Sequence, residues 1–164
     1  MRLVEGVVAV DDVDAFVAAL ADVAGDTGAT VQAFDARYVV SRRHLERAVE
    51  LADRAIERGE NVARDRAVEI LLYAAGRRQI TDALELGVDE GPNRAVILVD
   101  GGDETEAAEA VRSRILDRSE PTLGDYDPDR VREFFGITDA ELDAVDGDVE
   151  ALVLERVALL VVEK

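Results

Sequence analysis

The sequence predicts an α+β fold: a mostly antiparallel sheet of about four strands, packed with roughly six to eight helices in one domain over residues 1–164. Short β-branched or continuously apolar runs, typical of buried strands, recur along the chain. Between them, apolar residues recur at helical spacing. No internal repeat, low-complexity stretch or linker divides the chain. A parallel doubly wound sheet is the alternative, because one sequence does not reveal strand order.

The chain is expected to open with alternating strand and helix. A β-branched run predicts a strand over Leu3–Val10, and Asp11 or Asp12 then caps a helix that leads to a turn bracketed by Gly25 and Gly28.

A second strand is expected over Thr30–Phe34. After it come, in order, a turn at Asp35-Ala36, a short extended piece over Tyr38–Val40, and a helix opened by Ser41 and ended by Gly59.

The central stretch, residues 61–87, predicts two helices joined at a glycine. Four apolar residues at spacing i, i+3, i+4, i+7 predict a largely buried first helix: Ala67, Ile70, Leu71 and Ala74. Asn61 is the expected N-cap, and Gly76 suits the left-handed residue that closes such a helix.

The second helix of this pair is expected to have an exposed start at Arg77-Arg78-Gln79 and to end at Gly87, with one apolar face made by Ile80, Ala83 and Leu84. Two guanidinium groups would then lie at a helix N-terminus, where free N–H groups and the helix dipole already favour an anion. This start is therefore a candidate phosphate site.

The C-terminal half again mixes strands and helices. The expected elements are a buried strand over Ala95–Val99, a turn at Gly101-Gly102 into a helix, a helix capped by Asp127-Pro128, a short helix with the capping box Thr138–Glu141, a helix over Glu150–Leu154 and a closing strand over Val157–Val162.

Charge separates the middle of the chain from its flanks. The net charge is −18, with 19 basic and 37 acidic residues. Between Arg37 and Arg78, however, the chain has ten arginines and only seven acidic residues. Arg47, Arg54 and Arg58 are best explained as partners of acidic residues three or four positions away on a helix. Arg77 and Arg78 have no acid three or four residues before them.

Composition narrows the class of protein. Lysine occurs once against eighteen arginines, and together with twenty aspartates this indicates the cytoplasm of a salt-rich cell. An acidic protein of an ordinary cell is the alternative, and the near-absence of lysine disfavours it. At molar salt the Debye length is about 3 Å, so nucleic-acid contacts would have to be short-range. The chain has no cysteine, no secretory signal pattern and no apolar run long enough to span a membrane. A cytoplasmic protein with no membrane contact is expected.

No catalytic site emerges from the motifs. Gly101-Gly102 lacks the spacing of a phosphate-binding loop. The run from Asp125 to Asp129 begins like a calcium loop, but the positions that follow do not match. His44 is the single histidine, better explained as a packed polar residue than as a base contact beside the arginines. We expect neither an enzyme nor a cofactor or metal.

These residues carry a family resemblance that covers nearly the whole chain. Its blocks are Gln32–Ala36, His44-Leu45, Asn61–Ala63, Glu69–Tyr73, Gly76–Ile80, Ala83-Leu84 and Gly87. Together they resemble the small, non-catalytic subunit of the archaeal KEOPS complex, in the family of the p53-related protein kinase (PRPK)-binding protein. The block of glycine, arginines, glutamine and isoleucine is the most specific part.

The resemblance implies a function. Members of the family bind and stimulate the small atypical kinase/ATPase subunit of the complex and recruit tRNA by its single-stranded 3′ CCA end. The complex as a whole supports threonylcarbamoyladenosine modification of tRNA. Carried onto this chain, the RNA contacts fall on Arg77, Arg78, Gln79 and Ile80, and we add Arg64 from the same arginine-rich stretch.

The resemblance also places the kinase-binding surface partly near the C-terminus, on Val153, Leu154 and Val157, although ordinary core packing would explain these residues equally well. Two rival hypotheses remain. A helix, a glycine turn and a second helix with arginines at its start also describe a helix-turn-helix DNA-binding module. An enzyme acting on a small anionic metabolite at Arg77 and Arg78 would lack a nucleophile, metal cluster or cofactor loop.

Overall fold

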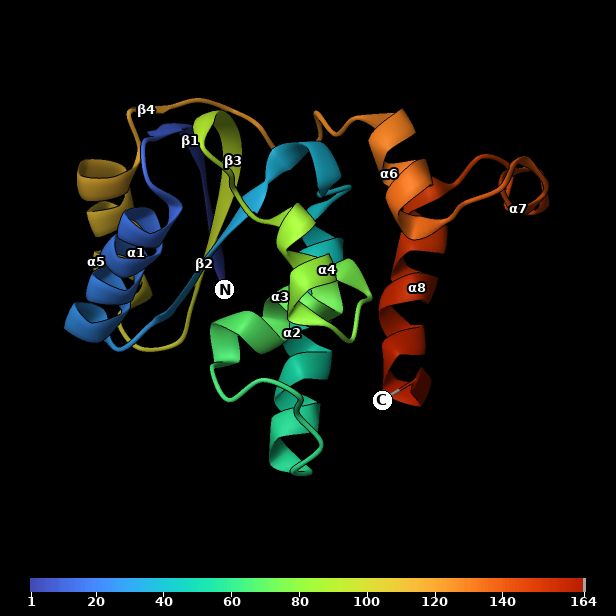
Figure 1. Ribbon diagram of the computed structural model, residues 1–164, viewed down its shortest axis with the longest axis horizontal. Helices are drawn as coiled ribbons and strands as arrows, with labels where there is room; N and C mark the ends of the chain where they lie inside the picture. The colour runs from blue at the N-terminus through green and yellow to red at the C-terminus, as the bar shows by residue number, and fades with distance from the viewer. Residues whose placement is uncertain (164) are drawn as a thin grey trace. The chain divides into compact units, whose positions relative to one another are not determined.

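The computed structural model describes residues 1–163, with side chains through Val161. Its elements follow the order β1 (Arg2–Val10), α1 (Val13–Thr27), β2 (Thr30–Asp35), the 3₁₀ helix η1 (Ala36–Tyr38), α2 (Arg42–Glu57), α3 (Arg66–Ala75), α4 (Ile80–Ala83), the 3₁₀ helix η2 (Leu84–Leu86), β3 (Gly91–Asp100), α5 (Glu104–Ala110), the π-helix η3 (Val111–Ile115), β4 (Arg118–Ser119), α6 (Pro128–Phe135), α7 (Asp139–Ala144) and α8 (Val149–Glu163) (Figure 1).

Two units make up the chain, and each has its own internal packing. The sheet unit contains Met1–Ala36 and Gly87–Leu123, and the helical unit contains Arg37–Leu86 and the chain from Gly124 onward. Within residues 1–163, no helix is long and apolar enough to cross a bilayer.

The sheet has the strand order β2-β3-β1-β4, and every neighbouring pair is antiparallel. Arg2 lies opposite Val99 in the β1–β3 pair, and Thr30 lies opposite Asp100 in the β2–β3 pair. Alternate residues of the three long strands pack against α1 and α5, which lie side by side (Figure 1). The predicted α+β fold with a four-stranded, mostly antiparallel sheet is confirmed.

The fourth strand is not the predicted one. The run Val157–Val162 belongs to the continuous helix α8, so the predicted closing strand is wrong. Val153, Val157 and Leu160 are buried at spacing i, i+4, i+7, which is the period of a helix and not of a strand. The sheet is completed instead by β4, two exposed residues that pair beside Gly6. A Cβ at Gly6 would lie 2.5 Å from the Arg118 carbonyl oxygen, so glycine allows this close approach.

Two smaller expectations also need correction. Gly25 lies inside α1, which ends at Thr27 with Gly28 in the left-handed conformation; the Gly28 N–H donates to the Ala24 carbonyl. Tyr38, where an extended piece is expected to start, is the last residue of the 3₁₀ helix η1.

The helical unit is built on α2, α3 and α8, which pack against one another. The Ser41 hydroxyl caps α2 as predicted. In α3, every residue from Glu69 to Ala75 is buried, which confirms the predicted burial of this helix. The exposed faces of α2 carry ion pairs at helical spacing, including Arg47–Glu50 and Arg54–Glu50.

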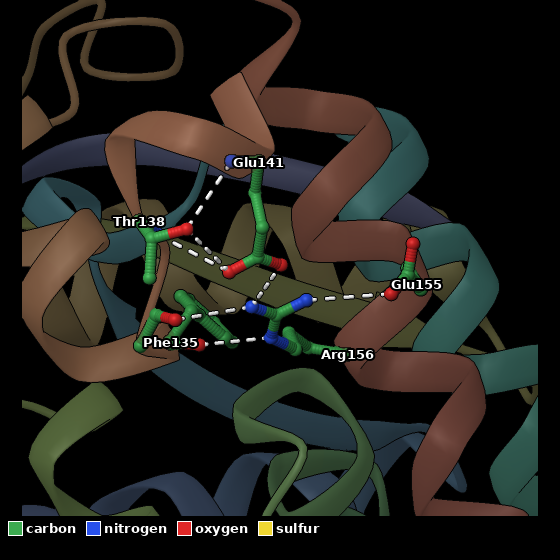
Figure 2. Close-up of polar contacts among 6 residues, drawn as sticks. Phe135, Thr138, Glu141, Glu155 and Arg156 are labelled. Atoms are coloured by element: carbon green, nitrogen blue, oxygen red, sulfur yellow. Dashed lines mark hydrogen bonds and ion pairs between the residues drawn. The ribbon is translucent and has the colours of Figure 1, made fainter. Parts of the chain in front are cut away.

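Arg156 joins three helices of this unit (Figure 2). From α8, its Nε donates to the Phe135 carbonyl at 2.9 Å and one Nη to the Gly136 carbonyl at 3.1 Å, at the C-terminus of α6. The same Nη lies 2.6 Å from a carboxylate oxygen of Glu141. Glu141 also completes the predicted capping box of α7 with Thr138. The hydrogen bond from Arg156 lowers the pKa of the Glu141 carboxyl below its ordinary value.

We expect Arg156→Met to destabilise the protein by about 2–3 kcal/mol, because the carbonyls at the end of α6 lose charged donors while the side-chain stem is kept. Urea unfolding monitored by circular dichroism measures this change. Arg118→Met is the control, since Arg118 is exposed and its side chain pairs, among the described residues, with half-buried Glu120 alone; its effect should stay within about 0.5 kcal/mol. Equal effects of the two substitutions would contradict the joining role of Arg156.

Candidate functional site

The site begins at Gly76, where α3 ends. Gly76 is left-handed, with φ of 60°. Its N–H donates to the Tyr73 carbonyl and the Arg77 N–H donates to the Leu72 carbonyl at 3.0 Å, which is the double closure of a Schellman motif. A Cβ at this position would lie 3.0 Å from the Arg156 carbonyl oxygen on α8. The conformation and the packing therefore both require glycine.

The two arginines after Gly76 point to different surroundings. Arg77 is half-buried; its guanidinium lies 4.4 Å from the centre of the Phe134 ring, and one Nη donates to the Phe134 carbonyl at 2.5 Å. Arg78 is exposed, and it has no hydrogen bond or ion pair with any residue of the described chain. Arg77 therefore fixes the turn to α6, whereas Arg78 is available to a ligand.

The helix after these arginines is shorter than predicted and begins later. Because the Arg77 N–H closes α3, Gln79 becomes the N-cap of α4, which is only Ile80–Ala83. The predicted helix start at Arg77-Arg78-Gln79 is therefore wrong, and the two arginines precede the helix instead of opening it. Of the three residues of the predicted apolar face, Ala83 is buried, whereas Ile80 is 43% exposed and Leu84 is 56% exposed. One turn of helix is also too short to serve as a recognition helix in a DNA groove.

Arg78 lines an open pocket of about 500 Å³ in the helical unit, together with Glu60, Val62 and Val161. Val62 and Val161 are 46% and 39% exposed, so the pocket has apolar walls as well as a cation and a carboxylate. The residues come from three parts of the chain: the loop after α2, the turn after α3 and the end of α8. Arg64, also exposed, follows in the same loop.

This loop replaces the predicted start of α3. Asp65, and not Asn61, is the N-cap, with its carboxylate accepting from the Ala67 N–H at 2.7 Å. Asn61 instead donates from its side chain to the Ala63 carbonyl at 2.8 Å. The carboxylate of fully buried Glu69 accepts from the N–H groups of Val62 and Ala63. Sequence reasoning missed Glu69, although an acid beside a fully apolar run was the available signal.

The arginine-rich stretch divides into paired and unpaired side chains. Besides the pairs made by Arg47 and Arg54, Arg42 pairs with Glu46 and Arg66 with Asp53. The expected pairing of Arg58 is not seen. Within the described part of the chain, four arginines of this stretch have no hydrogen-bonding or ionic partner on their side chains: Arg43, Arg58, Arg64 and Arg78.

The C-terminal residues predicted to bind a kinase lie on α8. Val153 and Val157 are fully buried, and Leu154 is half-buried. Leu154 shares one helix face with Ala158 and Val161, at spacing i, i+4, i+7. A direct contact from this helix would therefore involve Leu154 and its exposed neighbours, whereas Val153 and Val157 support it from the core.

His44 is a buried structural residue. Its side chain is fully buried; Nε2 lies 2.8 Å from the Ala74 carbonyl, and Nδ1 accepts from the Val40 N–H at 3.4 Å. Since a carbonyl only accepts, Nε2 carries the proton and the ring is neutral. Burial lowers the pKa of His44 to about 4. Among the described residues, no group of three or more histidine, aspartate or glutamate side chains could hold a metal ion.

A protein-family model described as "Kinase binding protein CGI-121" matches residues 10–160. The chain belongs to this family. The match includes α3, the turn that carries Arg77 and Arg78, and most of α8. No curated protein matches the chain. The family description names a binding function and no catalytic one, in line with the absence of a recognisable catalytic motif in the sequence of this CGI-121 family member.

We expect the stability contributed by neutral His44 to fall as pH decreases from about 6.5 to about 4. The unfolded state binds a proton at the ordinary histidine pKa and the folded state only near 4, so acid favours unfolding by about 3 kcal/mol over this window. Urea unfolding at pH 7, 5 and 4 measures this change.

His44→Gln is the matched variant, because its amide donates to the same carbonyl and does not titrate. The difference in unfolding free energy between wild type and variant should shrink by about 3 kcal/mol on acidification. If the unfolding free energies of the two proteins changed with pH in parallel, the pKa of His44 would not be lowered in the folded state.

Proposed function

We propose that this protein is the small, non-catalytic subunit of a KEOPS complex in the cytoplasm of a halophilic archaeon. It binds and stimulates the small atypical kinase/ATPase subunit and recruits tRNA through the 3′ CCA end, and so supports threonylcarbamoyladenosine modification. Membership of the kinase-binding family supports the first part. The open pocket beside Arg78 carries the second.

The pocket suits an unpaired nucleotide better than a duplex. Arg78 offers a guanidinium with no partner among the described residues, which can form paired hydrogen bonds with a phosphate. Val62 and Val161 offer apolar surface for the face of a base, and exposed Ile80 lies two residues from Arg78. Bases at a single-stranded end are free to leave the stack and enter such a hollow, whereas paired bases are not.

Salt strengthens the argument for direct contact. At molar ionic strength, charges more than about 3 Å apart are screened, so a net charge of −18 repels RNA only weakly. Contact-range hydrogen bonds and base packing are much less affected. Gln79 and Arg64, both exposed, extend the proposed RNA surface on either side of Arg78 in the sequence, and Arg77 holds the turn in place.

We predict that Arg78→Glu weakens tRNA binding at high salt by about tenfold or more, because it removes one charged phosphate contact and adds repulsion. Arg43→Glu is the control: Arg43 is also exposed and without a partner among the described residues, but it does not line the pocket. Fluorescence anisotropy of labelled tRNA gives both affinities. Equal losses for the two variants would show that only total charge matters.

The same assay shows which part of the tRNA the protein recognises. A tRNA trimmed of its CCA end should bind about tenfold more weakly, while changes in the anticodon arm leave the affinity unchanged. Equal losses from both changes would contradict recognition of the 3′ end. Arg77→Glu is not a clean probe, because it also breaks the contacts with Phe134.

The proposed kinase surface is the partly exposed face of α8. Leu154 lies on it, next to Ala158 along the helix, and Leu159 is 41% exposed nearby in the sequence. Burial of such apolar groups is the usual source of affinity between proteins. Val161 of this face also lines the pocket, but Leu154 does not, so a change at Leu154 tests the kinase surface separately.

We predict that Leu154→Arg weakens binding to the small kinase subunit by about tenfold and leaves tRNA affinity unchanged. Val17→Arg is the matched control, since Val17 is an apolar residue of α1 that is 55% exposed. Isothermal titration in molar salt measures binding to the kinase. Loss of binding in both variants, or in neither, would place the kinase surface elsewhere.

A further inference from the structure

Glu69 is a fully buried carboxylate that accepts hydrogen bonds from backbone outside its own helix. Its Oε1 accepts from the Val62 N–H at 3.1 Å and from the Ala63 N–H at 3.0 Å, and its Oε2 lies 3.4 Å from the Val62 nitrogen. The side chain reaches back from the first turn of α3 to the loop that precedes the helix. Two neighbouring N–H groups therefore converge on one carboxylate.

A buried carboxylate is costly unless hydrogen bonds replace its water. Here those hydrogen bonds come from backbone that no helix or strand satisfies, since residues 61–64 lie between α2 and α3. The loop has a second constraint in the side chain of Asn61, which donates to the Ala63 carbonyl. Glu69 thus fixes a segment that would otherwise have unsatisfied donors.

The fixed segment forms one wall of the pocket. Val62 turns its N–H toward Glu69 while its side chain remains 46% exposed and lines the pocket. Glu60 precedes it and also lines the pocket, and exposed Arg64 follows it. The distance between this wall and Arg78 therefore depends on where Glu69 holds the backbone.

We propose that Glu69 is the positioning residue of the pocket: its carboxylate holds the Val62–Ala63 backbone so that the pocket fits the unpaired 3′-terminal nucleotides of an RNA. This rests on the proposed function of the pocket. Glu69 touches no RNA itself, because its side chain is buried. Its contribution is to prepare the wall before the ligand arrives, which lowers the cost of binding.

Reach, and not charge, is the property that matters. Glu69→Gln keeps an oxygen at the position that now accepts both N–H groups, whereas Glu69→Asp keeps the charge but is one methylene too short. The proposal therefore orders the variants: Gln close to wild type, Asp and Ala impaired. A role based on charge alone would give the opposite order for Gln and Asp.

The experiment measures the affinity of each full-length variant for a CCA-ending tRNA and for the same tRNA trimmed, with hydrogen exchange of the Val62 and Ala63 amides alongside. We expect Glu69→Ala and Glu69→Asp to lose about tenfold in affinity for the CCA-ending tRNA and to exchange these amides faster. Glu69→Gln should stay within about threefold of wild type. Binding to the small kinase subunit should not change. Glu57→Ala removes the same negative charge at an exposed position and therefore controls for net charge.

Three outcomes would overturn the proposal. Unchanged CCA-dependent affinity in Glu69→Asp, with faster amide exchange, would show that the loop is held by Glu69 but is not part of the RNA site. Parallel losses of tRNA binding, kinase binding and global stability in every variant, including Glu69→Gln, would show a purely structural role. Absence of CCA-dependent binding in the wild type would refute the proposed function itself, and this is visible before any variant is made.

Discussion

The helical unit depends on one close approach, between Gly76 and the backbone of α8. Gly76 ends α3 in a left-handed turn, and a Cβ at this position would lie 3.0 Å from the Arg156 carbonyl oxygen. That turn sets the positions of the next two residues. Arg77 contacts Phe134, and Arg78 is exposed to solvent. Any other residue at this position would have to adopt a strained conformation and push α8 away. The different surroundings of Arg77 and Arg78 therefore follow from the conformation of Gly76.

Three buried or half-buried polar side chains supply what the backbone lacks at the ends of elements. Arg156 donates to the last carbonyls of α6, His44 donates to the carbonyl of Ala74 near the end of α3, and Glu69 accepts from the loop before α3. Each of the three side chains is ionisable, and each lies where the end of a helix leaves backbone donors or acceptors without partners. Replacing such a group by an apolar one leaves the backbone unsatisfied, which costs more than the group contributes when paired. These residues therefore specify where the helices end as well as how they pack.

Sequence patterns predict most of the long elements, with α8 as the exception, and predict the junctions poorly. The three long strands and the buried helix α3 follow from β-branched runs and from helical spacing, because burial imposes those periods directly. The run Val157–Val162 is predicted as a strand because a continuously apolar segment fits the period of a strand and that of a helix, and only its packing partners decide between them. The strand β4 is two exposed residues, and its pairing depends on the absence of a side chain at Gly6, which no local pattern encodes. Arg77 and Arg78 are identical in sequence terms, and only the fold distinguishes them.

The same limit applies to the candidate site, and it has a physical origin. Charge counting identified the arginine-rich stretch, but a count cannot separate arginines that an acid already neutralises from those that are available. In the fold, helical spacing removes Arg42, Arg47 and Arg54 from consideration, and a contact with Asp53 removes Arg66. The remaining cations matter in proportion to what surrounds them, since at high salt an isolated charge attracts little. Arg78 differs from Arg43 in having apolar walls and a fixed loop beside it, so the proposed selectivity for an unpaired nucleotide comes from the shape around the guanidinium and not from the charge it carries.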